Sequence, residues 1–354
     1  MKLIKYTILA VITILLTGSC EKIAMHPQPG TDNLSIFEEY VGIVTTKYAL
    51  SEVKGVDLEA LADSIRPFIT PELTQEDLYD YMFMITMRMK EGHTTLEAEE
   101  IGKVPAFGGF PWYEGYPPSY NSGIAGMYYY SEEANPDVQK ITTEDSYFEI
   151  KYGFLPQDQE IGYIVITSFD ISPSDQQLEV MMEYLKDAKG IIIEERSNFG
   201  GFIEFGARLV SYFTDKAYVF ATNYIKNGPG PDDVAASEMK ITPSGSSYAF
   251  TKPVMVLHDR ISFSTGSIFP VMMDPLEHVT TMGQTTGGGT GEIIEGYLAN
   301  GWKYVLSTSN LVDSEGRPTD NGMEPDIPVV FNPSDTASDA IIERAILEIQ
   351  TLTR

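Results

Sequence analysis

From about residue 160 onward, nearly continuous apolar runs alternate with amphipathic segments, and this alternation constrains the fold more than any other feature. The apolar runs have the length of strands, whereas the segments between them repeat apolar residues at helical spacing. Strands without polar alternation are buried on both faces, as in parallel sheets covered by helices. We therefore predict an α/β fold with a largely parallel sheet covered on both faces.

The expected elements can be placed run by run. Strands are expected at the runs IGYIVI (161–166), GIIIEE (190–195), PVMVL (253–257) and HVTTM (278–282). Helices are expected at 172–188, at 202–213, after Ser264 and at 334–352. The segment YLANGWKYVL predicts a hairpin that turns at Asn300 and Gly301, because Asn-Gly favours a two-residue turn.

Residues 35–93 are predicted to be helical. Thr74 can cap the last helix of this region, with Asp77 three residues on, close to a capping box. Apolar residues at helical spacing then predict a buried stripe of Leu78, Tyr81, Met82, Ile85 and Met89. Gly92 is expected to end the helix, which places His93 just beyond it.

Residues 96–158 are rich in Gly, Pro and aromatic residues, as in FGGFPWYEGYPPSY, and show no sustained periodicity. Their aromatic side chains could line a substrate groove, but a small β core is the preferred interpretation. The folded chain then divides into a helical subdomain at 35–95, a small β-rich subdomain at 96–158 and an α/β core at 159–354.

The first residues are typical of an export signal. Lys2 and Lys5 precede an apolar run that is too short to span a bilayer comfortably, and small residues lead to Cys20, the only cysteine. LLTGSC resembles the bacterial lipoprotein signal, although Thr17 stands where Leu is usual; the alternative is an ordinary secreted protein. The resemblance implies a signal peptide at 1–19, a lipidated Cys20, a polar tether at 20–34, and a place in the bacterial cell envelope facing the periplasm or the exterior.

The charge excludes one class of partner. With 51 acidic and 24 basic residues, the formal net charge is −27. Nucleic acid binding depends on Lys and Arg that displace counterions, so nucleic acid is not expected as a partner.

Three polar segments follow predicted strands: RSNFGG, HDRISFSTGS and GQTTGGGTG. In a sheet of this kind, reactive groups collect where strands end. Ser264 lies at the expected start of a helix, where unpaired N–H groups can stabilise an oxyanion. A serine there can equally be a simple helix cap, so these spacings leave both readings open.

Five segments in order, EGHTT, GIIIEERSNFGG, ISFSTGSIF, TTMGQTTGGGTG and NGMEPDIPV, resemble the C-terminal processing, or tail-specific, serine peptidases. The resemblance covers about 35–332 and is strongest to the branch that includes the tricorn protease core and the domains of interphotoreceptor retinoid-binding protein. It implies a crotonase-like or ClpP-like ββα core at 159–354, preceded by a helical subdomain, and no cofactor.

The same resemblance assigns the nucleophile to Ser264, with Ser262 and Ser267 as structural residues. Gly200 or Gly201 would supply one oxyanion N–H group and Thr265 the other. In RSNFGG the family pattern is preceded by Asp-Leu, which Glu194-Glu195 replaces here.

A base must accept the serine proton. One branch of the family uses a Lys, but Gly289 stands at that position. The other uses a His after the helical subdomain, which corresponds to His93. His258, six residues before Ser264 and next to Asp259, is the competing candidate and is expected to have no catalytic role.

A third group should hold the tautomer of the imidazole. The resemblance places this carboxylate near PTDNGMEPDIPV, with Asp320 as the first choice and Glu324 as the second. Either could instead be a solvated turn residue.

The predicted function is therefore an exported serine endopeptidase that acts on peptides or proteins and is held to the membrane by a lipid anchor. The rival hypothesis is an inactive scaffold that binds peptides or hydrophobic ligands. The four histidines lack metal-ligand spacing and no cysteine cluster exists, so no metal site is predicted.

Overall fold

The computed structural model describes residues 30–104, 122–144, 146–230, 232–330, 334 and 336–354. The predicted signal peptide, Cys20 and most of the predicted tether lie outside these residues. None of the helices in the described part is long and apolar enough to cross a membrane.

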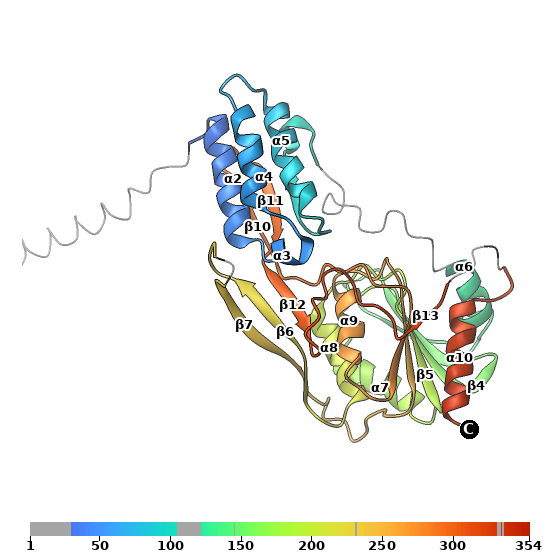
Figure 1. Cartoon of the computed structure of the whole chain (residues 1–354). Coiled ribbons are helices and arrows are strands. Elements are labelled where there is room, and N and C mark those ends of the chain that lie inside the picture. The colour runs from blue at the N-terminus through green and yellow to red at the C-terminus, as the bar shows by residue number, and fades with distance from the viewer. Residues whose placement is uncertain (1–29, 105–121, 145, 231, 331–333, 335) are drawn as a thin grey trace, which may run out of the picture.

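A seven-stranded sheet forms the centre of the α/β region (Figure 1). Its middle strands run parallel, and two antiparallel strands extend one edge. In spatial order the strands are β13 (Ile327–Pro328), β9 (Val279–Gly283), β8 (Val254–His258), β5 (Gly190–Glu194), β4 (Asp158–Ile166), β3 (Glu149–Leu155) and β2 (Gln139–Thr142). The predicted largely parallel sheet is confirmed.

Helices cover both faces of this sheet, which explains the uninterrupted apolar strands. Ile191 and Ile193 of β5 pack in one apolar cluster with α7 (Asp175–Leu185), α8 (Ile203–Val210) and α9 (Thr265–Met273). Ile192 points to the other face and packs with α10 (Ala340–Leu352). The last helix begins six residues later than predicted, because Asp339 caps it by accepting from the N–H groups of Ile341 and Ile342.

The helical region has a separate core. It contains α2 (Asn33–Lys47), α3 (Ser51–Lys54), α4 (Leu58–Ile65) and α5 (Gln75–Arg88), which pack against β1 (Thr95–Glu97), β11 (Lys303–Ser307) and β10 (Ile293–Tyr297). The predicted hairpin is confirmed, with Gly301 at φ +93° in its turn. Trp302 of the hairpin is 1% exposed within the helical core. The helical subdomain is therefore completed by residues that lie about 200 positions downstream.

The end of α5 differs from the prediction. Thr74 caps its start as expected, since its hydroxyl accepts from the Asp77 N–H at 3.1 Å. The helix nevertheless ends at Arg88, four residues before Gly92, and Lys90 takes the left-handed conformation with φ 53°. The next three residues form a tight polar loop instead of a last helical turn.

The segment 96–158 was expected to be a separate β-rich subdomain, and its described strands do not form one. β2 and β3 pair with β4 and so extend the large sheet. A third sheet instead joins β12 (Ser309–Asp313), β6 (Tyr218–Lys226) and β7 (Val234–Ile241). The short helical segments are α6 (Ser122–Ala125), Gly126–Tyr130, Arg66–Phe68, Glu99–Ile101 and Ser211–Phe213.

Candidate active site

Ser264 has the backbone conformation of a constrained turn. It directly precedes α9 and has φ 56° and ψ −125°, which non-glycine residues rarely adopt. Its N–H donates to Gly288 O at 2.9 Å, and its side chain makes no capping bond to the helix. The simple helix-cap role is therefore absent, and the partly exposed Ser264 is held in a strained backbone conformation.

The two neighbouring serines, Ser262 and Ser267, are buried and hydrogen-bonded. Ser262 Oγ donates to Glu195 O at 3.1 Å, and Ser267 Oγ donates to Ser262 O at 2.8 Å. The Gly288 N–H also donates to Ser267 Oγ at 2.8 Å. Both side chains hold the loops around Ser264 in place, which is the role the sequence predicted for them.

Gly200 packs directly against the serine. A Cβ atom at this position would lie 2.8 Å from Ser264 Cβ and 2.9 Å from Thr265 N, and its φ is +101°. The Gly200 N–H is already bonded to Asn198 Oδ1 at 2.9 Å. Within the described part of the chain, the N–H groups of Gly201 and Thr265 have no hydrogen-bond acceptor. Of the two glycines that were predicted as alternatives, Gly201 therefore offers the available donor.

His93 and Ser264 line the same cavity of about 320 Å³, together with Gly201 and Thr265. The His93 ring packs on Phe263, the residue before the serine, with ring centroids 4.6 Å apart. Phe263 also explains the missing lysine, because a side chain at Gly289 would lie 2.2 Å from its ring. The fold thus brings the end of the helical region to the serine over a sequence separation of about 170 residues.

Glu91 is the carboxylate in contact with His93. Its Oε1 lies 3.2 Å from His93 Nδ1, and both of its oxygens accept from the His93 N–H at 3.0 Å. Oε2 also accepts from Thr94 N and Thr94 Oγ1, at 2.7 and 2.9 Å. These bonds stabilise the tight loop after α5 and fix the carboxylate, which is fully buried.

The electrostatics of this pair favour an ion pair. Burial opposes charge on both groups, but the facing His93 charge and its hydrogen bonds lower the pKa of Glu91 to about 2. Burial likewise acts to lower the pKa of His93. The Glu91 charge, the contact with Glu91 and the nearby Asp320 charge together raise it above its usual value.

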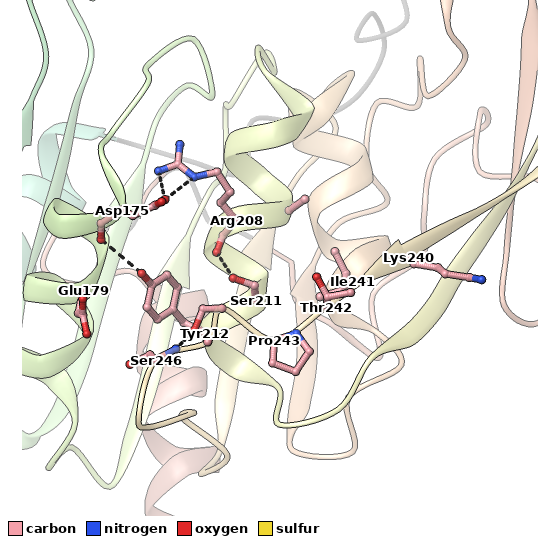
Figure 2. Close-up of a pocket in the computed structure, with 13 residues that line it drawn as sticks. Asp175, Glu179, Arg208, Ser211, Tyr212, Lys240, Ile241, Thr242, Pro243 and Ser246 are labelled. Atoms are coloured by element: carbon pink, nitrogen blue, oxygen red, sulfur yellow. Dashed lines mark hydrogen bonds and ion pairs between the residues drawn. The ribbon is translucent and has the colours of Figure 1, made fainter.

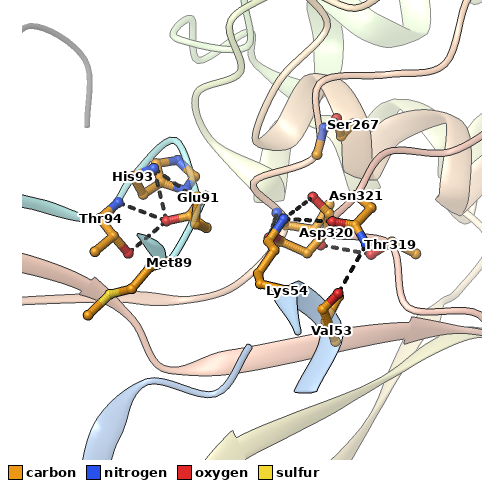
Figure 3. Close-up of polar contacts among 12 residues, drawn as sticks. Val53, Lys54, Met89, Glu91, His93, Thr94, Ser267, Thr319, Asp320 and Asn321 are labelled. Carbon is orange, nitrogen blue, oxygen red and sulfur yellow. Dashed lines mark hydrogen bonds and ion pairs between the residues drawn. The ribbon is translucent and has the colours of Figure 1, made fainter. Parts of the chain in front are cut away.

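Asp320 lies close by but has another partner (Figure 3). Its Oδ2 is 2.6 Å from Lys54 Nζ, and its Oδ1 accepts from the Thr290 N–H at 3.1 Å. Burial, followed by the Glu91 charge, raises the pKa of Asp320, although Lys54 opposes this. The predicted first-choice carboxylate therefore acts on His93 as a nearby charge and links α3 to the core.

The other predicted or competing residues lie elsewhere. Glu324 is exposed and lines two cavities that contain neither His93 nor Ser264. His258 is completely buried, and its Nδ1 lies 2.7 Å from Gln284 O. Burial lowers the pKa of His258 to about 4. It does not line the cavity of Ser264.

Sequence reasoning missed Glu91 and Lys54. Glu91 was part of the motif EGHTT, but its role depends on the loop that follows the early end of α5. Lys54 belongs to a four-residue helix, and nothing in its local sequence indicates a partner 266 positions away. Only the packing of the helical region on the core brings them to the site.

A second cavity, of about 470 Å³, does not bring a serine and a histidine together (Figure 2). Arg208 is paired with Asp175 at 2.6 Å, and Ser211 Oγ donates to the Arg208 carbonyl at 2.6 Å. Its lining includes no histidine. Among the described residues, no group of three or more His, Cys, Asp or Glu side chains could hold a metal ion.

Comparison with known proteins finds similarity to one peptidase family. Residues 160–329, which include Ser264 and both glycines, match Peptidase family S41. The chain is also 30% identical over 178 residues to the carboxy-terminal processing protease CtpA of Bacillus subtilis (strain 168). That alignment covers 50% of this chain but only 35% of the relative.

Solved structures resemble a larger part of this chain. A peptidase structure from Parabacteroides merdae has a TM-score of 0.79 and 27% identity, and the match covers 90% of this chain and 97% of that one. Mature CPAF, at 12% identity, has a TM-score of 0.62 and shares the fold over 90% of this chain and 96% of its own. The predicted fold of a C-terminal processing peptidase is confirmed.

Proposed function

We propose that this chain is a serine endopeptidase of family S41 that works through an acyl-enzyme. The observation that carries the proposal is the shared cavity of Ser264 and His93, in which the serine is strained and uncapped and two N–H groups have no acceptor. This arrangement supplies a nucleophile, a base and an oxyanion site, the three requirements of acyl transfer.

In the proposed reaction, Ser264 Oγ attacks the peptide carbonyl while its proton passes to His93. The Gly201 and Thr265 N–H groups donate to the resulting oxyanion. When the C–N bond breaks, His93 returns the proton to the leaving amine. Water then attacks the acyl-serine with His93 again as base, which releases the acid and restores the hydroxyl.

We assign the orientation of His93 to Glu91. Its carboxylate contacts Nδ1 and is itself fixed by bonds to two backbone N–H groups. Asp320 contributes a second negative charge that favours protonated His93. Glu324 has no part in this arrangement, because it is exposed at other cavities.

The test of the proposed function is covalent labelling. A fluorophosphonate should label the wild-type chain at Ser264, and Ser264→Ala should lose both the label and at least about 10³-fold in turnover while retaining its unfolding midpoint. Ser211→Ala, the same change at a serine of the other cavity, should keep the label. Absence of a label on well-folded wild-type protein, combined with tight peptide or lipid binding, would instead favour the inactive scaffold.

We also propose that the chain is exported and anchored through Cys20. The support is the signal-like stretch before this cysteine. Expressed in a bacterium, the full chain should fractionate with membranes, whereas Cys20→Ser should be released into the soluble fraction. Equal membrane association of both forms would rule out the anchor and leave the peptidase assignment untouched.

A further inference from the structure

The walls of the active-site cavity are apolar. Side chains of Ile203 and Ile268 come from α8 and α9, and Met239 and Leu311 come from the third sheet. Phe202 and Ile293 stand at the rim, 48% and 51% exposed. A cavity of about 320 Å³ with such walls accommodates a long aliphatic stem.

The polar groups between these walls are dominated by acceptors. Asn223 of β6 is 3% exposed and lines the cavity. Its Nδ2 donates to Glu292 Oε1 at 2.8 Å, and its Oδ1 is buried without a hydrogen-bond partner. Glu292 and Glu204 are exposed residues that also line the cavity, and neither forms an ion pair with a described residue. A buried acceptor without a donor among the described residues is costly, so a donor from a bound ligand would stabilise this site.

The cavity offers no competing cation. Apart from His93, none of its described lining residues is basic. Its two threonine hydroxyls are already engaged, since Thr265 Oγ1 donates to Gly201 O at 2.6 Å and Thr290 Oγ1 bonds Thr319 Oγ1 at 2.7 Å. An incoming positive group therefore meets two carboxylates and one amide oxygen without a built-in counterion.

We infer that this cavity selects substrates whose residue beside the scissile bond is Lys or Arg. The aliphatic stem packs between the apolar walls, and the cationic end donates to Asn223 Oδ1 and pairs with Glu292 and Glu204. The inference rests on the proposed peptidase function, because it names the substrate class of the same site.

The test compares peptides that are identical except for lysine or norleucine, an uncharged residue with a similar stem. Turnover by the wild-type chain should favour the lysine peptide by at least about tenfold in kcat/KM, the usual scale for a hydrogen bond to a charged group. Binding of both peptides to Ser264→Ala, measured by calorimetry, should show the same preference without any chemistry.

Variants then test which residues of the cavity cause the preference for lysine over norleucine. Glu292→Gln and Asn223→Leu should each reduce the lysine-to-norleucine ratio of kcat/KM severalfold. Glu179→Gln, which removes the same charge from α7 in the other cavity, should leave the ratio unchanged. The norleucine peptide removes any effect of stem packing from the comparison.

The outcomes separate the two proposals. Turnover that is equal for both peptides or better for norleucine, with Ser264 labelled, overturns the selection of cations and leaves the peptidase assignment intact. A preference for lysine in binding without turnover supports the cation site and counts against peptidase activity. Equal binding of both peptides to Ser264→Ala overturns the inference whatever the turnover.

Discussion

At several positions of this site, contacts with neighbouring atoms leave room for only one type of residue. Gly200 is the clearest case, because the space where its Cβ would lie is filled by the nucleophile and by the first amide of α9. Glu91 is the second, since its two oxygens accept four hydrogen bonds and contact the imidazole. Both residues hold other groups of the site in place, so conservative substitutions at them test how strongly activity depends on that placement.

Gly200→Ala should displace Ser264 and lower kcat/KM by about 100-fold or more, because a 2.8 Å contact with Ser264 Cβ cannot be accommodated. We also expect a loss of about 1–3 kcal/mol in unfolding free energy from strain. Gly316→Ala is the matched control, with φ +85° and open space around the added methyl. Comparable activity losses in the two variants would show that backbone strain alone is responsible.

Glu91→Gln should shift the pH profile of kcat/KM. The Glu91 charge raises the pKa of His93, so its removal lowers that pKa and keeps the neutral base present at lower pH. The acid limb should therefore move to lower pH, while the plateau falls about ten- to a hundredfold as the ring loses its partner. Asp320→Asn should produce a smaller shift in the same direction. A larger effect of Glu324→Gln than of Glu91→Gln would contradict our assignment.

At the scale of elements, local sequence patterns were sufficient to predict the strands of the large sheet. They were insufficient to predict the end of α5 or which strands complete the helical region. The runs from IGYIVI to HVTTM became β4, β5, β8 and β9, because strands buried on both faces need little besides apolar residues. The end of α5 was predicted too late, since a glycine was expected to terminate it and Lys90 took the left-handed position instead. Whether β10 and β11 belong to the core or to the helical region depends on long-range packing, which local periodicity does not contain.

The buried end of β8 should make folding sensitive to acid. His258 is neutral in the fold, with its pKa lowered from 6.5 to about 4, whereas the unfolded chain binds its proton at the ordinary value. Between these two values only the unfolded state is protonated, so stability falls as pH drops, by at most about 3 kcal/mol from this group. Denaturant midpoints measured from pH 7 to pH 4 should fall less steeply for His258→Asn. Parallel curves would show that His258 does not contribute.

At the scale of the whole molecule, the proposed catalysis depends on how two apolar cores are joined. The core that includes α2, α4, α5 and the β10–β11 hairpin carries Glu91 and His93 on its edge, and the core around α7, α8 and α9 carries Ser264. Lys54 and Asp320 form a buried ion pair across this junction, with side chains 6% and 1% exposed. The motifs around Ser264 could be predicted from sequence, but the junction that brings His93 to it could be supplied only by a family resemblance.

Lys54→Met should weaken this junction. Removing one partner leaves Asp320 buried without its counterion, at a cost of about 3–5 kcal/mol in unfolding free energy. Lys54→Met combined with Asp320→Leu should recover most of that loss. Lys303→Met breaks an exposed pair with Glu295 and should cost less than about 1 kcal/mol. A Lys54→Met variant as stable as Lys303→Met would mean that apolar packing alone holds the two cores together.

The division of the machinery between two cores has a thermal consequence. Gentle heating that loosens only the junction would separate base from nucleophile while each core stayed folded. The protein would then stop hydrolysing substrate but keep its native far-ultraviolet circular dichroism spectrum. Cooling would restore the rate of hydrolysis. The chain would thus lose activity reversibly on heating, at a temperature below that at which either core unfolds.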